Sequence, residues 1–227
     1  MASRNSSKTP DRPKRVLIVD DHPVLREGLA TQINREPDLT VCGEADNARA
    51  ALSAIEQLEP DLVLADINLP GRNGLELIRD IHVLRPSLPV LALSMHDETV
   101  FAERVLRAGG RGYVSKQQSG QSLIGAIRRV LSGQIYLKDD VSTRLLDRLA
   151  GKPQGSRTIS PVELLTDREL EVFTMIGEAK ETKEISTSLG MSSKTVEAHR
   201  ASIKRKLKLK TGPELTRHAV LWVEAVG

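Results

Sequence analysis

The stretch that decides the fold is RVLIVDD, residues 15–21. Its four consecutive apolar residues are typical of a strand that is buried on both faces of a sheet. Two aspartates follow at the end of this strand, and a helical pattern begins directly afterwards, at residues 24–35. The stretch therefore predicts the first β-then-α unit of a parallel sheet.

The same unit recurs through the first 132 residues. We expect further strands at residues 39–45, 62–65, 90–93 and 112–114, and helices after them at residues 48–59, 75–84, 99–108 and 122–132. Five such units predict an α/β fold, a five-stranded doubly wound parallel sheet with helices on both faces. In such sheets, function gathers at the carboxyl ends of the strands.

The chain is long enough for two small domains. We expect a disordered tail, a first domain, a linker that contains a helix near residues 140–149, and an all-α second domain, with boundaries at 1–13, 14–132, 133–161 and 162–227. Residues 152–156 (KPQGS) have the composition of a linker. The second domain is predicted to contain four helices.

Local capping signals mark those four helices. The residues TDRE at 166–169 form a capping box that opens the first one. Gly190 ends a short second helix at residues 183–189, and Ser192 can cap a third that runs to about residue 207. Thr211 opens a fourth, which extends to residue 225.

Composition narrows the class of protein. The 227 residues are 39% hydrophobic and include only five aromatic residues, so aliphatic side chains must build the cores. Cys42 is the single cysteine, which excludes an intramolecular disulfide and any Cys/His metal spacing. The first 15 residues are polar and unlike a secretory signal, and no apolar run approaches the ~20 residues of a membrane helix. We therefore expect a cytoplasmic protein without a membrane partner.

The charge of the second domain is polarised. Residues 191–217 contain eight basic and two acidic residues, whereas residues 163–190 contain three basic and seven acidic residues. The whole chain carries only +3. This pattern predicts one basic face that binds a polyanion.

Chemistry-bearing residues follow four of the predicted strands. Asp20 and Asp21 follow the first strand, Asp66 the third, Ser94 the fourth and Lys116 the fifth. The first and third strands should be neighbours, so the three carboxylates should meet at one edge. Their repulsion favours a hard divalent ion such as Mg²⁺, and a carboxylate can accept a phosphoryl group as a nucleophile. The competing interpretation is that these aspartates only cap loops and helices.

The segments VLIVDDHP, DLVLADINLPGRNGLEL, VLALSMHDE and GYVSK resemble the receiver domain of two-component response regulators, which has a flavodoxin-like fold. The resemblance implies that a histidine kinase phosphorylates Asp66. It implies that Asp20 and Asp21 hold Mg²⁺ together with Asp66 and the backbone carbonyl of Asn68. It also implies phosphoryl-binding and switch roles for Ser94, Lys116 and Tyr113. The sequence departs from the family at Gln117, where many receivers have proline, and at Leu69, where methionine is common.

The third helix of the second domain is basic and follows a glycine turn, as in a helix-turn-helix. Val196, Ile203 and Leu207 share one face and should pack inward. Residues that suit base edges or phosphates are expected on the other face, namely Lys194, Thr195, Glu197, Ala198, Ala201, Lys204, Arg205, Lys206 and Lys208, with Lys210 beyond the helix. Arg200 projects near the apolar stripe and is expected to pair with an acid such as Glu169 or Glu184. The competing interpretation is a solvated charged helix.

Residues 164–209 resemble the LuxR-type DNA-binding domain. With the receiver, this resemblance extends to the NarL/FixJ class of response regulators and implies homodimers on paired half-sites of double-stranded DNA. A stripe on the fourth helix is a candidate for the dimer contact; its members are Leu215, Ala219, Trp222 and Val226. For Trp222, a position in the core of its own domain is the favoured alternative. RNA polymerase is a further expected partner.

These features predict a transcription regulator controlled by phosphorylation, whose only catalysis is its own phosphoryl transfer and dephosphorylation. One rival is a Mg²⁺-dependent phosphohydrolase of the aspartyl-phosphate type, although such enzymes use Asp-x-Asp where this chain has adjacent aspartates. A second rival is a regulator that works without phosphorylation.

Overall fold

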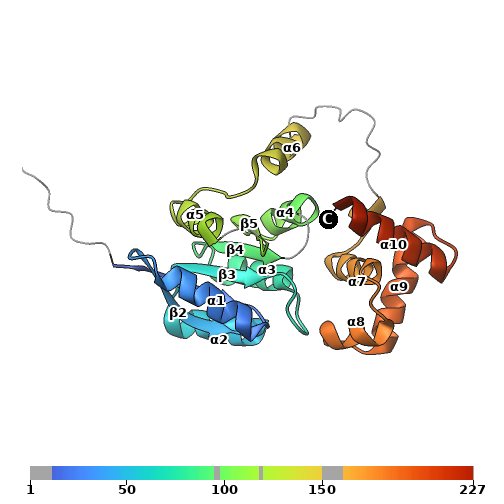
Figure 1. The fold of residues 1–227 in the computed structure, drawn as a ribbon, viewed down its shortest axis with the longest axis horizontal. Helices are drawn as coiled ribbons and strands as arrows, with labels where there is room; N and C mark the ends of the chain where they lie inside the picture. Colours follow the sequence, from blue (N-terminus) through green and yellow to red (C-terminus); the bar gives the residue numbers. More distant parts are fainter. Residues whose placement is uncertain (1–11, 95–97, 118–119, 150–160, 227) are drawn as a thin grey trace, which may run out of the picture.

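The structure is a computed structural model that describes residues 12–94, 98–117, 120–149 and 161–226. Most of the expected N-terminal tail and the linker residues 152–156 lie outside the described residues. Figure 1 shows a sheet domain and a helical domain side by side.

The first domain is the predicted five-stranded parallel sheet. Its strands are β1 (Lys14–Val19), β2 (Leu39–Ala45), β3 (Leu62–Asp66), β4 (Val90–Ser94) and β5 (Gly112–Ser115). Its helices are α1 (Pro23–Asn34), α2 (Ala48–Leu58), α3 (Gly74–Leu84), α4 (Glu98–Arg107) and α5 (Gly120–Leu131). The strand order is β2-β1-β3-β4-β5, so β1 and β3 are neighbours as expected.

Both faces of the sheet are buried, which explains the uninterrupted apolar runs. In β1, Leu17 and Val19 belong to one hydrophobic cluster, whereas Val16 and Ile18 belong to the other. Helices α2, α3 and α4 supply residues to the first cluster, and α1 and α5 supply residues to the second. The strand ends are thereby fixed between two packed layers.

The segment after α5 packs on the edge of the sheet. The backbone N–H of Tyr113 in β5 donates to the carbonyl of Tyr136 at 3.0 Å, and the N–H of Tyr136 donates to the carbonyl of Arg111 at 3.0 Å. The predicted linker helix is present as α6 (Asp139–Leu149), which contacts α4. The first part of the expected linker is therefore bound to the sheet domain.

The second domain consists of a short 3-10 turn, η1 (Pro161–Leu164), and the four expected helices. These are α7 (Asp167–Gly177), α8 (Thr182–Ser188), α9 (Ser193–Leu207) and α10 (Gly212–Val226). The Thr166–Glu169 capping box is confirmed, and the side chain of Ser192 accepts from the N–H of Thr195 at 3.1 Å at the start of α9. The inward positions of Val196 and Ile203 are also confirmed, since both are fully buried.

The two domains touch between the β3–α3 loop, α3 and α4 on one side and α7 and α8 on the other (Figure 1). Asp167 at the start of α7 pairs with Arg79 of α3 at 2.6 Å and with Arg104 of α4 at 2.7 Å. The N–H of Gly71 donates to the carbonyl of Leu189 at 3.3 Å. This contact joins the loop after β3 to the turn between α8 and α9.

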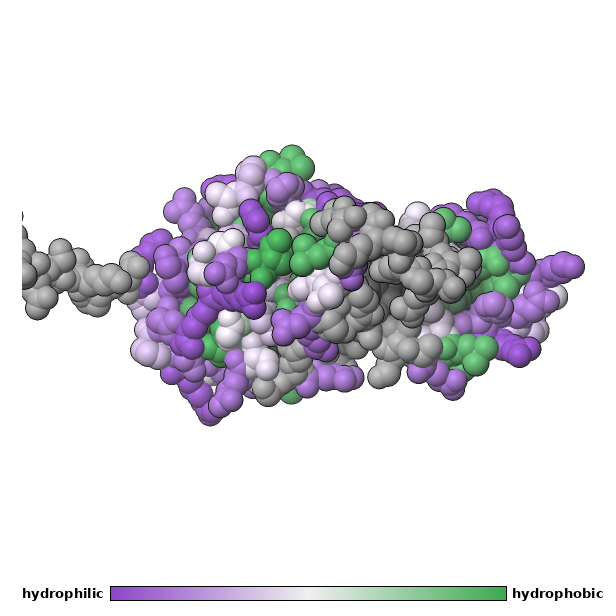
Figure 2. Space-filling view, turned by 90° about the horizontal axis from the view of Figure 1, so that it is seen from above, coloured by the Kyte–Doolittle hydropathy of each residue, from purple (hydrophilic) through white to green (hydrophobic). Residues whose placement is uncertain are grey.

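Among the described helices, none is long and apolar enough to cross a membrane. On the face drawn in Figure 2, apolar side chains form separate groups among hydrophilic ones.

Candidate functional site

The four strand ends that carry the predicted residues converge at one edge of the sheet. Asp20 follows β1 directly, Asp66 is the last residue of β3, and Ser94 is the last residue of β4. All three are buried, with at most 1% of each residue exposed. Lys116 follows β5, and its backbone N–H donates to the carbonyl of Ser94 at 2.8 Å. The predicted set therefore meets in one small region.

Lys116 joins the two buried carboxylates. Its Nζ lies 2.6 Å from Oδ2 of Asp20 and 2.7 Å from Oδ2 of Asp66. Burial lowers the pKa of Lys116, but the charges of Asp66 and Asp20 outweigh it, so the net pKa is raised. The lysine is thus held as a cation beside both carboxylates.

Asp66 has the environment of a reactive carboxylate. The net pKa of Asp66 is raised to about 6. Burial is the largest cause, and the neighbouring charge of Asp20 acts in the same direction, whereas Lys116 lowers the pKa. The N–H of Asn68 donates to Oδ1 of Asp66 at 3.1 Å. Strongly perturbed carboxylates in such surroundings are typical of functional sites.

The acidic cluster has the ligands of a hard cation. Asp20, Asp21, His22 and Asp66 each offer a ligand atom, and these atoms all lie within 4.8 Å of one another. Oδ2 of Asp20 and Oδ1 of Asp21 are buried and have ion-pair contacts but no hydrogen bond within the described part of the chain. Clustered carboxylate oxygens fit Mg²⁺, which prefers oxygen ligands.

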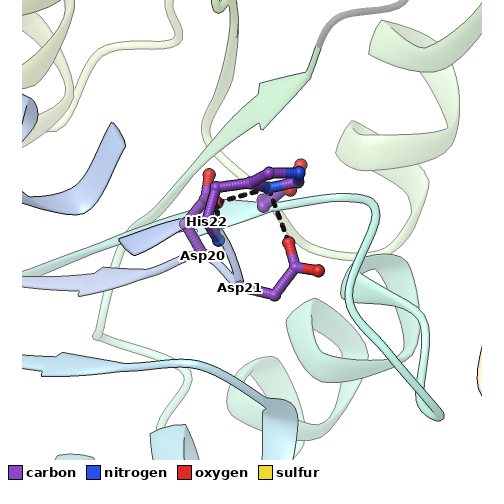
Figure 3. Close-up of side chains that lie close together, drawn as sticks. Asp20, Asp21 and His22 are labelled. Atoms are coloured by element: carbon purple, nitrogen blue, oxygen red, sulfur yellow. Dashed lines mark hydrogen bonds and ion pairs between the residues drawn. The ribbon is translucent and has the colours of Figure 1, made fainter. Parts of the chain in front are cut away.

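His22 belongs to the acidic cluster but was not among the residues predicted for it. Its Nδ1 lies 2.7 Å from Oδ1 of Asp21 and 3.1 Å from Oδ1 of Asp20, as Figure 3 shows. Its backbone N–H also donates to Oδ1 of Asp20 at 2.8 Å. The signal was available, because His22 is adjacent to the two aspartates and precedes the first turn of α1. His22 thus orients both carboxylates.

A glycine fixes the loop that follows Asp66. A Cβ on Gly74 would lie only 2.1 Å from the carbonyl oxygen of Asp66, so only glycine lets α3 begin this close to β3. The N–H of Gly74 donates to the carbonyl of Ile67 at 2.9 Å. The close approach of Gly74 therefore fixes the position of Asp66, at the end of β3, relative to the start of α3.

The predicted switch aromatic, Tyr113, is fully buried in β5. Its strand pairs with β4, where Tyr113 is in register with Ala92, two residues before Ser94. Tyr113 and Ser94 therefore lie on neighbouring strands, β5 and β4, and the side chain of Tyr113 is buried.

The α9 residues that were expected to contact DNA are mostly exposed. Exposed members of that set are Lys194, Thr195, Glu197, Ala198, Ala201, Arg205, Lys208 and Lys210, whereas Lys204 and Lys206 are half-buried. Glu197 also accepts from the hydroxyl of Thr182 at 2.8 Å. Most of this surface is available to a ligand.

Lys206 and Arg200 have partners inside the second domain. Nζ of Lys206 lies 2.6 Å from Oε2 of Glu169, which also accepts from the N–H of Thr166 at 2.7 Å. Arg200 pairs with Glu197, at 3.6 Å, and not with the acids that were expected for it. Burial raises the pKa of Glu169, but bonds from Lys206, Thr166 and Ser202 outweigh it and leave the pKa at about 2.

Glu169→Ala is expected to lower the stability of the second domain by roughly 3 kcal/mol, because it leaves Lys206 and the N–H of Thr166 without their carboxylate. The contribution of a carboxylate with a lowered pKa is present above its usual value of 4.5 and is lost as the pH falls toward 2. Urea unfolding at pH 7, followed by fluorescence of the single tryptophan, Trp222, measures it.

The matched control is Glu178→Ala, which removes a more exposed carboxylate paired with Lys180 and should cost less than about 1 kcal/mol. Equal losses for the two variants would contradict a structural role for Glu169.

The expected dimer stripe on α10 is corrected by the structure. Leu215 and Ala219 are fully buried within the hydrophobic core, and the ring of Trp222 packs against Phe173 of α7 with centroids 5.6 Å apart. The side chain of Val226 lies outside the described residues. A helical stripe can pack on a partner or on its own domain, and here α7 packs against α10 on the side of Leu215, Ala219 and Trp222.

This parallel sheet, with an acidic pocket and a buried lysine at the strand ends, followed by a helix-turn-helix bundle, defines a class of two-domain regulators. Residues 16–128 match the response regulator receiver domain, and residues 163–219 match the bacterial regulatory proteins of the luxR family. The chain belongs to the response regulators of the NarL/FixJ class.

Its relatives span nearly the same length. It is 34% identical over 209 residues to the oxygen regulatory protein NreC of Staphylococcus carnosus, covering 91% of this chain and 96% of NreC. It is 35% identical over 206 residues to the response regulator GacA of Pseudomonas viridiflava, covering 91% and 95%. A solved structure of two RcsB dimers bound to two parallel DNAs is 26% identical, with a TM-score of 0.55, and covers 91% of this chain and 97% of that one.

Proposed function

We propose that a sensor histidine kinase phosphorylates Asp66 and that this modification controls sequence-specific binding of α9 to DNA. The observation that carries the proposal is Lys116, whose ammonium contacts the buried carboxylates of Asp66 and Asp20 at the strand ends. A lysine in this position can neutralise an oxygen of the incoming phosphoryl group.

The residues of the pocket have separate roles in this proposal. Asp20, Asp21 and Asp66 would hold Mg²⁺ together with the backbone carbonyl of Asn68, and the bound ion would neutralise charge on the transferring group. The carboxylate of Asp66 is the nucleophile. Lys116 and the hydroxyl of Ser94 bind oxygens of the phosphoryl group, and the same residues support its later hydrolysis.

The phosphoryl group acts on the rest of the chain through charge and new hydrogen bonds. Ser94 lies on the strand next to Tyr113, and Tyr113 donates its backbone N–H to Tyr136 in the segment that leads to α6. A shift of Ser94 toward the phosphoryl group therefore acts on β5 and on the segment between the domains. Phosphorylation changes the equilibrium only if the two states bind the group with different affinity.

In the DNA complex, α9 enters the major groove from its N-terminus. Its exposed residues Glu197, Ala198 and Ala201 suit base edges, with Lys194 and Thr195 in the first turn. The phosphate contacts are Lys204, Arg205, Lys208 and Lys210, and Lys206 can reach a phosphate only by leaving Glu169.

The active form is proposed to be a homodimer, as in the RcsB structure with two dimers on DNA. Two linked recognition helices bind one duplex more tightly than a single helix does. Leu221 on α10 is 53% exposed, and it replaces the buried stripe as the candidate contact. RNA polymerase is the proposed downstream partner.

Arg205→Ala is expected to weaken binding by a similar factor on all DNA sequences and to reduce the salt slope by about 1, because it removes one phosphate contact. Fluorescence anisotropy over a series of salt concentrations, with two unrelated duplexes, measures both quantities. Arg217→Ala, which removes an exposed arginine from α10, is the control and should leave the slope unchanged. A loss confined to one duplex would contradict the assignment of Arg205 to the backbone.

The proposed function is tested by measuring DNA affinity and oligomeric mass of the full chain with and without acetyl phosphate and Mg²⁺. We expect the phosphodonor to raise affinity for a selected DNA site and to increase the mass. Unchanged affinity and mass in a fully phosphorylated sample would contradict phosphorylation control.

A further inference from the structure

Glu197 is the only acidic residue in α9 (SKTVEAHRASIKRKL), a helix that carries five basic residues. On a surface that binds a polyanion, a carboxylate is repelled by the phosphates and lowers the affinity for the DNA backbone. It can contribute to DNA binding only through a contact with the bases. The contacts of Glu197 therefore bear on which base the helix selects.

The carboxylate of Glu197 is held by one of its two oxygens. The hydroxyl of Thr182 donates to Oε1 of Glu197 at 2.8 Å, and Nε of Arg200 lies 3.6 Å from the same oxygen. Oε2 accepts no hydrogen bond within the part of the chain that the structure describes. The side chain of Glu197 is 60% exposed, so Oε2 is available to a donor on a ligand.

Thr182 is itself fixed, because it is the first residue of α8. The start of this helix is set by a capping box, in which the N–H of Glu181 donates to Oε2 of Glu184 at 2.8 Å. Ile185 of α8 and Val196 of α9 are fully buried in the same hydrophobic cluster. The hydroxyl of Thr182 is therefore presented to α9 by two packed helices.

A basic hollow of about 630 Å³ lies beside this pair, and both Thr182 and Arg200 line it. Its lining includes three basic side chains and one acidic one, Lys180, Lys183, Arg200 and Glu181. Basic side chains at such a place suit a DNA phosphate, and phosphate contacts fix the register of a protein on the duplex. A phosphate in the hollow would therefore also fix where Glu197 lies along the groove.

A carboxylate only accepts hydrogen bonds, and this restricts the base that it can contact. In the major groove, guanine and thymine present acceptors, adenine presents an amino donor beside the acceptor N7, and cytosine presents its N4 amino donor alone. Ala198 and Ala201 are small and exposed on the same helix, so they allow a close approach to the base edges. A carboxylate at this position therefore favours cytosine.

We propose that Glu197 selects a cytosine in the DNA site through Oε2, and that Thr182 is a positioning residue that sets this preference without touching a base. The proposal rests on the proposed function, in which α9 enters the major groove. It adds the identity of one selected base and a residue outside α9 that determines specificity.

The role of Thr182 follows from conformational freedom. A free glutamate side chain on the surface occupies several rotamers and must lose that freedom when it contacts a base. The hydrogen bond from Thr182 to Oε1 restricts these rotamers before DNA binds, so the contact of Oε2 with cytosine costs less. Loss of the hydroxyl should weaken the preference for cytosine and leave backbone contacts unchanged.

Selection of binding sites from randomised DNA duplexes tests the role of Glu197 in the full chain, with acetyl phosphate and Mg²⁺ present. We expect the wild type to prefer cytosine over guanine and thymine at one position by at least about fivefold. Glu197→Ala should lose the preference at that position alone. Glu197→Gln should change the preferred base there to adenine, because an amide pairs with adenine through its donor and its acceptor.

The same selection tests Thr182. Thr182→Val keeps the shape of the side chain and should reduce the preference for cytosine about 2- to 10-fold at that position. Thr182→Ser should retain the preference. The matched control is Thr187→Val, since Thr187 is also on α8 but its hydroxyl donates to the carbonyl of Lys183 in the same helix, at 3.0 Å.

The outcomes separate this proposal from the proposed function. A wild type that selects no sequence would contradict the proposed function and this proposal together. A wild-type motif that is unchanged in Glu197→Ala would overturn this proposal alone. A motif unchanged in Thr182→Val, or a uniform loss of affinity with a steeper loss in salt, would assign Thr182 to the backbone and refute its positioning role.

Discussion

Replacing Asp66 with asparagine is expected to reduce phosphoryl incorporation from acetyl phosphate by at least about 100-fold, because the neutral amide has nearly the same shape but is not a nucleophile. The buried environment of Asp66 makes this a specific chemical test, since the other carboxylates of the pocket remain. Incorporation is measured on the full chain by intact mass spectrometry in the presence of Mg²⁺. The DNA-affinity increase produced by the phosphodonor should disappear in the same variant.

The matched control is Asp46→Asn. Asp46 also follows a strand, β2, at the same edge of the sheet, but it is exposed. Incorporation should match that of the wild type. Equal labelling of the Asp66→Asn variant and the wild type would remove Asp66 as the acceptor.

Asp20→Asn is expected to weaken Mg²⁺ binding by at least about 100-fold, because changes next to metal ligands already cost 10- to 100-fold and this one removes a ligand charge. Asp20 is fully buried, and its Oδ2 lies 2.6 Å from Nζ of Lys116, so its carboxylate is held inside the cluster. Isothermal titration calorimetry with Mg²⁺ measures the change. The Mg²⁺ concentration needed for half-maximal labelling should rise in parallel.

Glu44→Gln provides a control for the loss of one negative charge near the pocket. Glu44 is on β2 and pairs with Arg26, which donates to the backbone carbonyl of Asp20 at 2.6 Å. Its substitution should change Mg²⁺ affinity by less than about threefold, as expected for an exposed charge. Similar effects of the two substitutions would mean that the pocket attracts the ion only through its net charge.

The sheet domain could be predicted because its pattern is local and repeated. Four apolar residues before Asp20 and the run before Asp66 are each typical of a strand buried on both faces. Parallel order then brings the carboxyl ends to one edge, so the meeting of Asp66, Ser94 and Lys116 follows from position in the chain alone. The capping box at Thr166 identified the start of α7, and the N-cap residue Ser192 identified the start of α9, for the same local reason.

The remaining features depend on long-range packing that local patterns do not encode. The stripe of Leu215 and Ala219 has the spacing of a binding face, and only the position of α7 makes it a core. Lys206 has the sequence context of a phosphate contact, whereas Glu169 lies 37 positions away in the chain and still pairs with it.

The contact between the domains is a clearer case. Asn73 and Glu171 are ordinary capping and helix residues in the sequence, and the hydrogen bond from Asn73 to Glu171 arises from how two independently patterned domains dock. His22 differs from them, because it is adjacent to Asp20 and Asp21 and could have been included among the predicted pocket residues.

Identifying the residue that carries the phosphoryl group is the most direct test of the central claim. The full chain is treated with acetyl phosphate, the acyl phosphate is reduced with borohydride, and the modified peptide is sequenced by mass spectrometry. We predict a single modified residue, Asp66, and no modification when Mg²⁺ is chelated. A modified Asp20 or Asp21, or a label on a serine or histidine with Asp66 untouched, would contradict the claim.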